Sequence, residues 1–150
     1  MIAVVQTIDS GSVAVKNYST SQRKTKEGLI VFLGVSKTDT ETDVEKVSKK
    51  LLKLRIFPDA DEKMNIDIGS SGGEVLLISQ FTLLGDLKGN NRPNFTDAAG
   101  KELAIKLYEL FADKLIQEGL AVTKGFFGEH MQITANLNGP VTIILDSKKL

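Results

Sequence analysis

The sequence of 150 residues lacks cysteine altogether, and this absence limits the chemistry that the protein can perform. Without cysteine the chain forms no disulfide bond and offers no thiolate nucleophile or ligand, a composition that suits a reducing compartment. No apolar run approaches the roughly 20 residues that span a bilayer. The first ten residues, MIAVVQTIDS, lack the basic and long apolar regions of a signal peptide. We therefore expect no membrane partner.

Histidine is nearly absent too, since His130 is the only one. A zinc site draws on several cysteine, histidine or acidic ligands, and a Ser-His-Asp triad would depend on this one residue without a G-x-S-x-G turn. The glycine-rich segment GSSGG (69–73) lacks the Lys-Ser/Thr pair of a phosphate-binding loop and is expected to be a flexible turn. We expect His130 to be a surface or structural residue, and neither a metal nor a cofactor.

There is no excess of charge of either sign, because 19 basic residues balance 19 acidic ones. A protein that coats nucleic acid non-specifically needs an excess of basic charge, so DNA is not an expected partner. A local patch would still be enough to hold a short piece of RNA. The candidates for such a patch are Lys88, Arg92, Lys148 and Lys149, although most surface lysines are only solvated.

Strands outnumber helices in the predicted secondary structure, and the two do not alternate strictly. IAVVQTI and SVAVK, separated by Ser10-Gly11, are expected to form a hairpin, and LIVFLGV (29–35) and VLLISQFTLL (75–84) are typical of buried strands. Amphipathic patterns predict helices over about 42–54, with Thr42 and Glu45 as a capping box, and over about 98–118. The last strands are LAVTKGFFG, MQITANL and PVTIILD, and NYSTSQRKTKEG (17–28) is expected to be a loop. The length fits one domain, 1–150, of the α+β class.

Two segments carry unusual residues at strand ends. The segment SQFTLLG (79–85) places Ser79, Gln80 and Thr82 at the end of the strongest strand, where they either face solvent or deliver polar groups and backbone N–H groups to a pocket. Gly139-Pro140 separates two good strands and is either a simple corner or a functional feature. Thr142 lies on the same face as Pro140 and is either an ordinary strand residue or part of a site.

Taken together these segments resemble one family. SQFTL (79–83) and NGPVT (138–142) occur with RPNF (92–95) and GFFGEHM (125–131) between them, a combination that is similar to the D-aminoacyl-tRNA deacylases. FLGVSKTDTE (32–41) and LRIFPDADEKMN (54–65) also resemble that family in spacing. The likeness therefore extends over nearly the whole chain.

The resemblance implies a β-rich body of mixed and antiparallel sheets, barrel-like, with two packed helices, and a cytoplasmic homodimer with its sites at the subunit interface. The family hydrolyses the ester that joins a D-amino acid to the 3′-terminal adenosine of tRNA, and it also removes glycine from mischarged tRNA. The implied partner is therefore aminoacylated tRNA, with no cofactor.

The resemblance also assigns roles to residues. In the family the Gly-Pro peptide is cis and reaches into the partner's site, where the carbonyls of Gly139 and Pro140 would engage the α-amino group. An L-side chain would collide with this pair, a D-side chain would not, and glycine would pass. Met131 and Ala104 correspond to residues of the substrate pocket, although an alanine such as Ala104 is more often simple core.

The expected chemistry needs no histidine. By resemblance, backbone N–H groups near Phe81 and Thr82 polarise the ester carbonyl, and the 2′-hydroxyl of the substrate assists the attack. Ser79 and Gln80 would position the substrate. The main role expected of Thr142 is to line the site, and a role as nucleophile ranks second, because no base is visible beside it.

Four positions depart from the family pattern, and they lie around the Gly-Pro pair rather than in it. These are Thr7 in place of an arginine, Asn90 in place of a glycine, Lys124 in place of a threonine and Leu137 in place of an asparagine. The departures leave two alternatives open, a non-catalytic module that binds the acceptor end of tRNA, and a hydrolase of another ester that uses Thr142 or Ser79.

Overall fold

One mixed sheet organises the chain in the computed structural model, which describes residues 1–15, 22–89 and 91–150. Its strand order is β2-β1-β3-β6-β7, and β8 also pairs with β1. The strands of this sheet are β1 (Ile2–Val15), β2 (Gln22–Thr25), β3 (Gly28–Gly34), β6 (Glu74–Ser79), β7 (Val122–Lys124) and β8 (Met131–Asp146). A separate pair is formed by β4 (Phe57–Pro58) and β5 (Met64–Ile66). The helices are α1 (Glu41–Leu52), α2 (Ile68–Ser71), the 3₁₀ helix η1 (Phe81–Leu84) and α3 (Lys101–Gln117).

The centre of the sheet is parallel and its flank antiparallel. β3, β6 and β7 run parallel, whereas β1 is antiparallel to β2, β3 and β8. Parallel strands covered on both faces tolerate continuous apolar runs, which is why LIVFLG and EVLLIS carry no alternation. The apolar run predicted at 29–35 is thus confirmed as a central strand.

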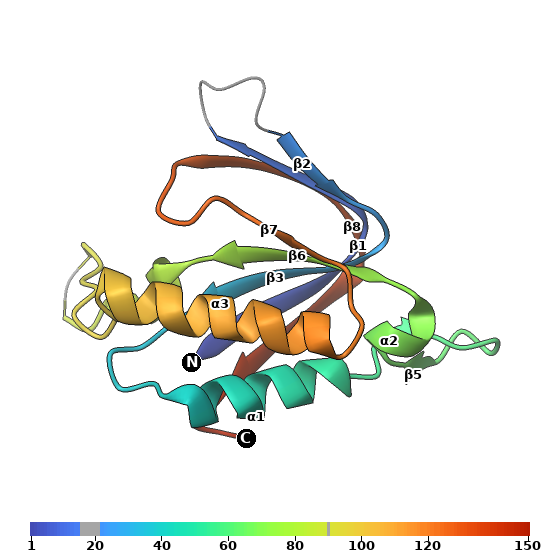
Figure 1. Cartoon of the computed structure of the whole chain (residues 1–150), viewed down its shortest axis with the longest axis horizontal. Coiled ribbons are helices and arrows are strands. Elements are labelled where there is room, and N and C mark those ends of the chain that lie inside the picture. The colour runs from blue at the N-terminus through green and yellow to red at the C-terminus, as the bar shows by residue number, and fades with distance from the viewer. Residues whose placement is uncertain (16–21, 90) are drawn as a thin grey trace.

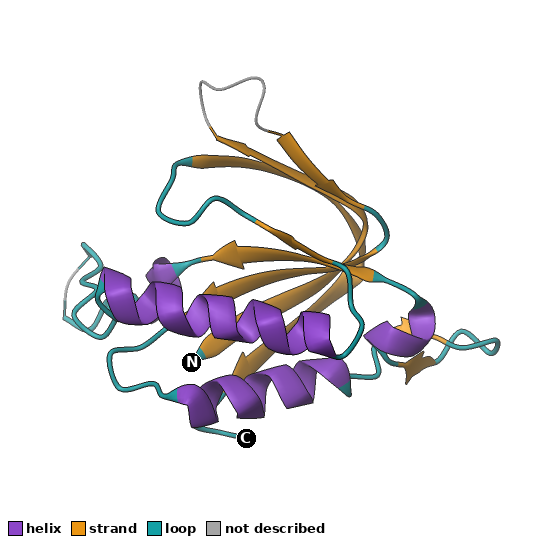
Figure 2. Ribbon diagram, in the orientation of Figure 1, coloured by secondary structure: helices purple, strands orange, loops and turns teal. Residues whose placement is uncertain are grey.

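The sheet bends sharply, and each of its faces has its own apolar core. Figure 1 shows two limbs that meet at one side, with α1 and α3 lying side by side over the limb that contains β3 and β6. One core lies under these helices and includes Val44, Val47 and Phe111. The other lies between the limbs and joins Val13 and Ile133 to Ile78. Figure 2 shows the helices confined to one side of the strands, so the α+β class and the barrel-like body with two packed helices are confirmed.

The hairpin expected at Ser10-Gly11 is wrong, because β1 continues through these residues. Gly11 lets β1 pass close to β6, since a Cβ there would lie 3.0 Å from the Leu76 side chain. β8 is likewise one strand instead of the two expected around Gly139-Pro140. β2 occupies part of the expected loop 17–28, and the rest of that stretch up to Ser21 lies outside the described residues. The polar side chains of an exposed edge strand explain why the sequence pattern missed β2.

Both long helices are confirmed, but α1 uses a different cap from the one expected. Its N-cap is Thr40, two residues before Thr42, and the backbone N–H of Thr40 donates to the Asp43 carboxylate at 2.9 Å. The Thr42–Glu45 pair has capping spacing, but Glu45 instead forms an ion pair with Lys114 of α3 at 3.2 Å. In the described part of the chain no helix is both long and apolar enough to cross a membrane.

Candidate functional site

The strand β6 ends at Ser79 and passes directly into the 3₁₀ helix η1. The backbone N–H of Gln80 donates to the carbonyl of Leu33 at 2.8 Å, which keeps the turn attached to β3. Gly34 makes this close approach possible, because a Cβ there would lie 2.6 Å from the side chain of Leu84. The Gln80 side-chain amide donates to the Thr82 hydroxyl, so these two predicted site residues are in direct contact.

The turn leaves backbone donors free. The first N–H groups of any helix have no intrahelical acceptor. Within the described residues, no backbone or side-chain acceptor takes the N–H of Phe81 or that of Thr82, and both residues are exposed. Two adjacent free donors at a helix start can stabilise a negatively charged oxygen.

Phe81, Met131 and Ala104 belong to three different elements, η1, β8 and α3. The Phe81 ring is 57% exposed and packs edge-to-face on Phe95, with ring centroids 5.0 Å apart. Met131 lies beside β6, since its sulfur and the Ile78 side chain both lie 3.0 Å from the point that a Gly125 Cβ would occupy. Ala104 lies in the first turn of α3 and packs against the core under the helices, as expected for an alanine with only a packing role.

Gly139 and Pro140 lie on a large bulge of β8. Gln6 of β1 faces Thr142, and Ile8 faces Leu137, so a step of two residues on β1 corresponds to a step of five on β8. The extra residues project from the sheet, and both Gly139 and Pro140 are exposed. Gly139 has φ +145°, and a Cβ there would lie 2.2 Å from the Val141 nitrogen, so only glycine fits.

Side chains of β1 hold the bulge at its base. The hydroxyl of Thr7, which is buried, donates to the carbonyl of Asn138. The Asn138 side-chain amide donates to the Asp9 carboxylate at 2.7 Å. Thr7 therefore supports the segment before Gly139 from the position where the family pattern has an arginine. Leu137 is 53% exposed and supplies no hydrogen bond.

The expected cis peptide is wrong for this structure, since no peptide bond in the described residues is cis. A trans bond is the lower-energy form of an X-Pro peptide by about 0.5–1 kcal/mol. Pro140 is exposed, so no packing contact within the chain offsets that preference.

The two groups of predicted residues are separated within one chain. Pairing across the sheet places Thr7, next to the bulge, level with Leu29 and hence with Val75, near the start of β6. Phe81 follows the other end of β6, six residues further on. At about 3.3 Å per residue, the bulge and the turn lie roughly 20 Å apart along the strands, with β3 and β1 also between them. One chain alone does not bring Gly139 and Pro140 to the turn at Phe81.

Neither group contains an ionisable side chain, which restricts the chemistry. Residues 79–82 and 139–142 are all uncharged. The Thr142 hydroxyl is exposed and accepts a hydrogen bond from the Gln6 side chain at 3.0 Å, so no base activates it. His130 is exposed and makes no side-chain hydrogen bond to any described residue. Groups of three or more potential metal ligands are absent from the described residues.

The four candidate RNA-binding residues differ in whether they form ion pairs within the chain. Lys148 forms ion pairs with Asp43 at 2.8 Å and with Asp39 at 3.4 Å, and Lys149 lies 3.7 Å from Asp146. Lys88 and Arg92 are exposed in the loop that follows η1. Lys124, at another departure from the family pattern, pairs with Glu109, and Asn90 lies outside the described residues.

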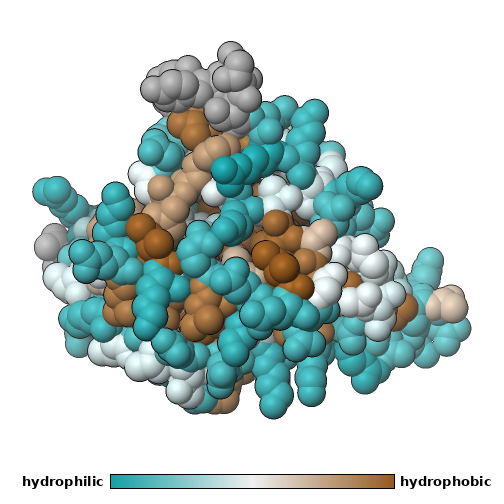
Figure 3. Space-filling view, in the orientation of Figure 1, coloured by the Kyte–Doolittle hydropathy of each residue, from teal (hydrophilic) through white to brown (hydrophobic). Residues whose placement is uncertain are grey.

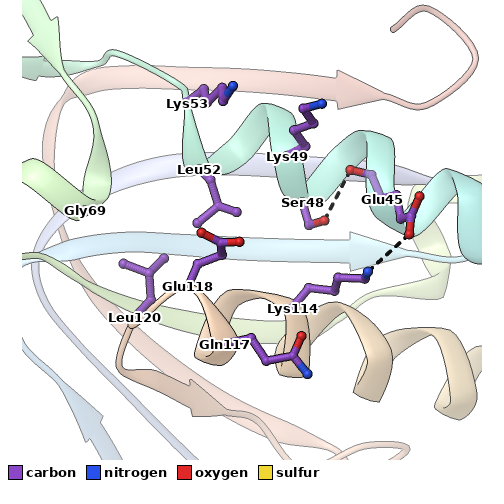
Figure 4. Close-up of a pocket in the computed structure, with 10 residues that line it drawn as sticks. All are labelled: Glu45, Ser48, Lys49, Leu52, Lys53, Gly69, Lys114, Gln117, Glu118 and Leu120. Atoms are coloured by element: carbon purple, nitrogen blue, oxygen red, sulfur yellow. Dashed lines mark hydrogen bonds and ion pairs between the residues drawn. The ribbon is translucent and has the colours of Figure 1, made fainter.

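A cavity of 530 Å³ between α1 and α3 contains none of the predicted site residues. Figure 4 shows Glu45 and Lys114 joined across it, with Leu52 and Leu120 as its apolar wall. Its lining comes from α1, α2, α3 and the residues just after α1 and α3, so neither the turn nor the bulge borders it.

Comparison with known proteins shows which family the chain belongs to. A sequence model of the family described as D-Tyr-tRNA(Tyr) deacylase matches residues 4–146. The chain belongs to the D-Tyr-tRNA(Tyr) deacylase family. Relatives named D-aminoacyl-tRNA deacylase from Thermosipho melanesiensis and Thermotoga petrophila are 45% and 46% identical, over 100% of this chain and 99% of each relative.

Two solved structures have the same fold. A structure described as "c-Myc DNA Unwinding Element Binding Protein" is 36% identical and has a TM-score of 0.89, over 97% of this chain and 98% of that chain. Another, described as a probable eukaryotic D-amino acid tRNA deacylase, has a TM-score of 0.81 over 96% of this chain and 97% of that chain, and at 18% identity it shows the fold alone. The resemblance drawn from SQFTL and NGPVT is thus confirmed, and the deacylase family is a family of enzymes.

Sequence reasoning missed two residues that hold segments next to the predicted site residues. Arg23 of β2 lies 4.0 Å from the centre of the Phe126 ring and donates to the carbonyls of Lys124 and Gly125. Gly34 carries no motif, but it ends a buried apolar run, which marks a close backbone approach. Arg23 lies in the stretch expected to be a loop, so no pattern indicated its contact.

Proposed function

We propose that this protein hydrolyses the ester between a D-amino acid and the 3′-terminal adenosine of tRNA, and that it also releases glycine from mischarged tRNA. The observation that carries the proposal is the pair of free backbone N–H groups at Phe81 and Thr82, on a turn that matches the family motif. The names of the full-length relatives support the same substrate class.

The chemistry that these groups can supply is electrostatic. An aminoacyl ester is already activated, so a donor pair that stabilises the developing oxyanion can lower the barrier without a protein nucleophile. The 2′-hydroxyl next to the ester assists the attack in this proposal. Ser79 and Gln80 position the substrate, and Met131 and Ala104 line the pocket beside them.

The active unit in this proposal is a homodimer. One chain keeps the Gly139–Pro140 bulge roughly 20 Å from the turn, and the bulge projects from the sheet with both residues exposed. A second copy would bring its own bulge against the turn of the first. The exposed apolar side chains Leu137 and Ile144 on the same strand support an interface there.

The bulge would act as a steric filter. A rigid backbone segment that excludes one side of the α-carbon rejects L-amino acids without reading the side chain, and it accepts D-amino acids of many kinds. Glycine has no side chain to exclude. Thr142 lines this part of the site, and its unactivated hydroxyl is not needed for the attack.

Release of amino acid from matched D-tyrosyl-tRNA, L-tyrosyl-tRNA and glycyl-tRNA tests the proposal. We expect release from the D-tyrosyl and glycyl substrates, and an L-tyrosyl rate close to that of spontaneous hydrolysis. Equal release of D- and L-tyrosine would contradict the chiral filter. Binding of tRNA without any release by folded protein would favour the non-catalytic alternative.

A further inference from the structure

Four lysines form a ridge on the outer face of α1. Lys46 and Lys50 are four residues apart, as are Lys49 and the C-cap residue Lys53, so the two pairs lie side by side on one face of the helix, and all four lysines are exposed. At 1.5 Å per residue the ridge extends about 10 Å along the helix axis. Figure 3 shows hydrophilic side chains projecting along the edge of the molecule where α1 lies.

Charge is segregated around α1, although the chain as a whole is neutral. The acidic residues of the helix each have a cation, since Glu41 pairs with Lys106, Glu45 with Lys114 and Asp43 with Lys148. None of the four ridge lysines forms an ion pair with any residue in the ranges 1–15, 22–89 and 91–150. The ridge is therefore a local positive surface without internal compensation.

The ridge also surrounds a hollow. A shallow depression of 290 Å³ is lined by the four lysines and Leu150. In Figure 4, the side chains of Lys49 and Lys53 leave α1 on the side away from Lys114 and Glu118, although both residues also contribute to the lining of the cavity between the helices. Four exposed lysines beside one hollow supply positive charge for an anion that carries several charges, such as neighbouring phosphates of a nucleic-acid strand.

The ridge lies within reach of the proposed site. The end of β3 contacts η1 through Gly34 and then leads to the start of α1, so the turn and the helix begin at the same edge of the sheet. Lys46 lies five residues into α1, about 8 Å along its axis from Glu41, and Lys53 about 18 Å. A chain of nucleotides that starts at Phe81 could therefore continue along this side of the protein.

We infer that the α1 lysine ridge binds the phosphate backbone of the tRNA whose aminoacylated end occupies the site at Phe81. The inference rests on the proposed function for its choice of RNA. The ridge supplies affinity without reading sequence, because phosphate contacts carry no base information. It holds the body of the tRNA, whereas the turn and the bulge select the amino acid.

The test replaces all four ridge lysines with glutamine, which keeps the length and helix propensity of the side chains. The control carries four substitutions of the same charge at exposed lysines elsewhere that form no ion pair with described residues: Lys24→Gln, Lys26→Gln, Lys63→Gln and Lys101→Gln. Circular dichroism checks that both variants fold. Binding of fluorescent uncharged tRNA is then measured across a salt series.

We expect the ridge variant to bind tRNA at least about tenfold more weakly than the control, with a salt dependence reduced by about three phosphate contacts. With D-tyrosyl-tRNA as substrate, its KM should rise while kcat stays unchanged. With D-tyrosyl-adenosine, which has no phosphate backbone, both variants should match the wild type.

Equal tRNA affinity and equal salt dependence in the two variants would overturn the inference. So would lysine-dependent binding to vesicles of anionic phospholipid with unchanged tRNA binding, which would assign the ridge to a membrane surface. The uncharged tRNA assay does not depend on catalysis. If the protein deacylates nothing but the ridge variant still loses tRNA binding, the proposed function fails and the inference stands.

Discussion

At the scale of residues, the proposed site depends on single backbone groups and not on reactive side chains. The N–H groups of Phe81 and Thr82 are free among the described residues, and Gly139 is held at φ +145° with no room for a Cβ. Backbone groups cannot be removed by ordinary side-chain substitution. A test of their role needs a residue that changes the backbone itself, and proline is such a residue.

Replacing Phe81 with proline removes one free N–H group with little backbone strain. The preceding Gln80 lies outside the α region that a following proline disfavours, with φ −145° and ψ 81°. We expect Phe81→Pro to lower kcat for D-tyrosyl-tRNA by about 10²–10³-fold, the usual cost of losing one oxyanion donor. The control is Phe81→Ala, which loses the ring but keeps the N–H. Equal losses of kcat in single-turnover assays of the two variants would show that the ring matters and the N–H does not.

Thr7 illustrates how a departure from a family pattern can be compensated. Its hydroxyl supports the carbonyl of Asn138 at the base of the bulge. Thr7→Val removes this hydrogen bond at nearly constant shape, and we expect a loss of about 1 kcal/mol in the free energy of unfolding together with faster release of L-tyrosine. Thr7→Ser keeps the hydroxyl and should retain the D/L rate ratio. If Thr7→Val has the same D/L rate ratio as Thr7→Ser, the Thr7 hydroxyl does not support the bulge.

At the scale of elements, the sequence predicted the buried strands and helices better than the exposed ones. The run at 29–35 is apolar because its strand is covered on both faces, and the two long helices have a clear apolar side, so these elements were predicted correctly. The strand expected over 75–84 ends at Ser79, and its last residues form the 3₁₀ helix η1 instead. β2 is an exposed edge strand, and the continuity of β1 through Ser10-Gly11 depends on pairing with β8, more than a hundred residues away. The turn and bulge could be identified by motif, but their separation within one chain depends on that long-range pairing.

The start of α1 connects an element to the stability of the whole fold. Burial opposes ionisation of Asp43, but hydrogen bonds from Lys148 and Ser147 outweigh it and hold the pKa of the carboxyl well below its usual value. Ser147 in turn accepts a hydrogen bond from the amino group of Met1 at 2.9 Å. The carboxylate thus joins α1 to both ends of the described chain.

The sign of the pH dependence follows from this lowered pKa. Above about pH 4, the usual pKa of a free aspartate, the ionised Asp43 contributes its full stabilisation, and this is lost as the pH falls toward the lower pKa of the folded state. We expect Asp43→Asn to lower the free energy of unfolding by about 2 kcal/mol at pH 7. The difference from wild type should shrink as the pH falls below about 4.

Urea unfolding at a series of pH values checks this expectation. Asp113→Asn, on the exposed side of α3, is a control that removes an aspartate with no ion pair to a described residue. A constant difference between Asp43→Asn and wild type from pH 7 to pH 3 would mean that the charge of Asp43 does not stabilise the fold.

At the scale of the whole molecule, the sheet connects the two halves of the proposed site and also keeps them apart. The turn at Phe81 follows one end of β6, and the bulge at Gly139 lies level with the other end. Neither can move toward the other without breaking the pairing of β1, β3 and β6. A site that uses both must therefore combine two copies of the chain.

Mixing two inactive variants tests this arrangement directly. Phe81→Pro damages the turn. Gly139→Ala damages the bulge, whose carbonyls hold the α-amino group of the substrate in the proposed site, because an added Cβ would collide with the Val141 nitrogen. In a two-fold symmetric dimer with sites shared between subunits, each mixed dimer contains one site built from two intact halves. Refolding the variants together at equal concentration should therefore restore up to roughly a quarter of the wild-type activity, since about half of the dimers are mixed and each has one intact site of two. If the turn and bulge of the same chain formed the site, every site in the mixture would carry one defect, and activity would stay at the level of the separate variants.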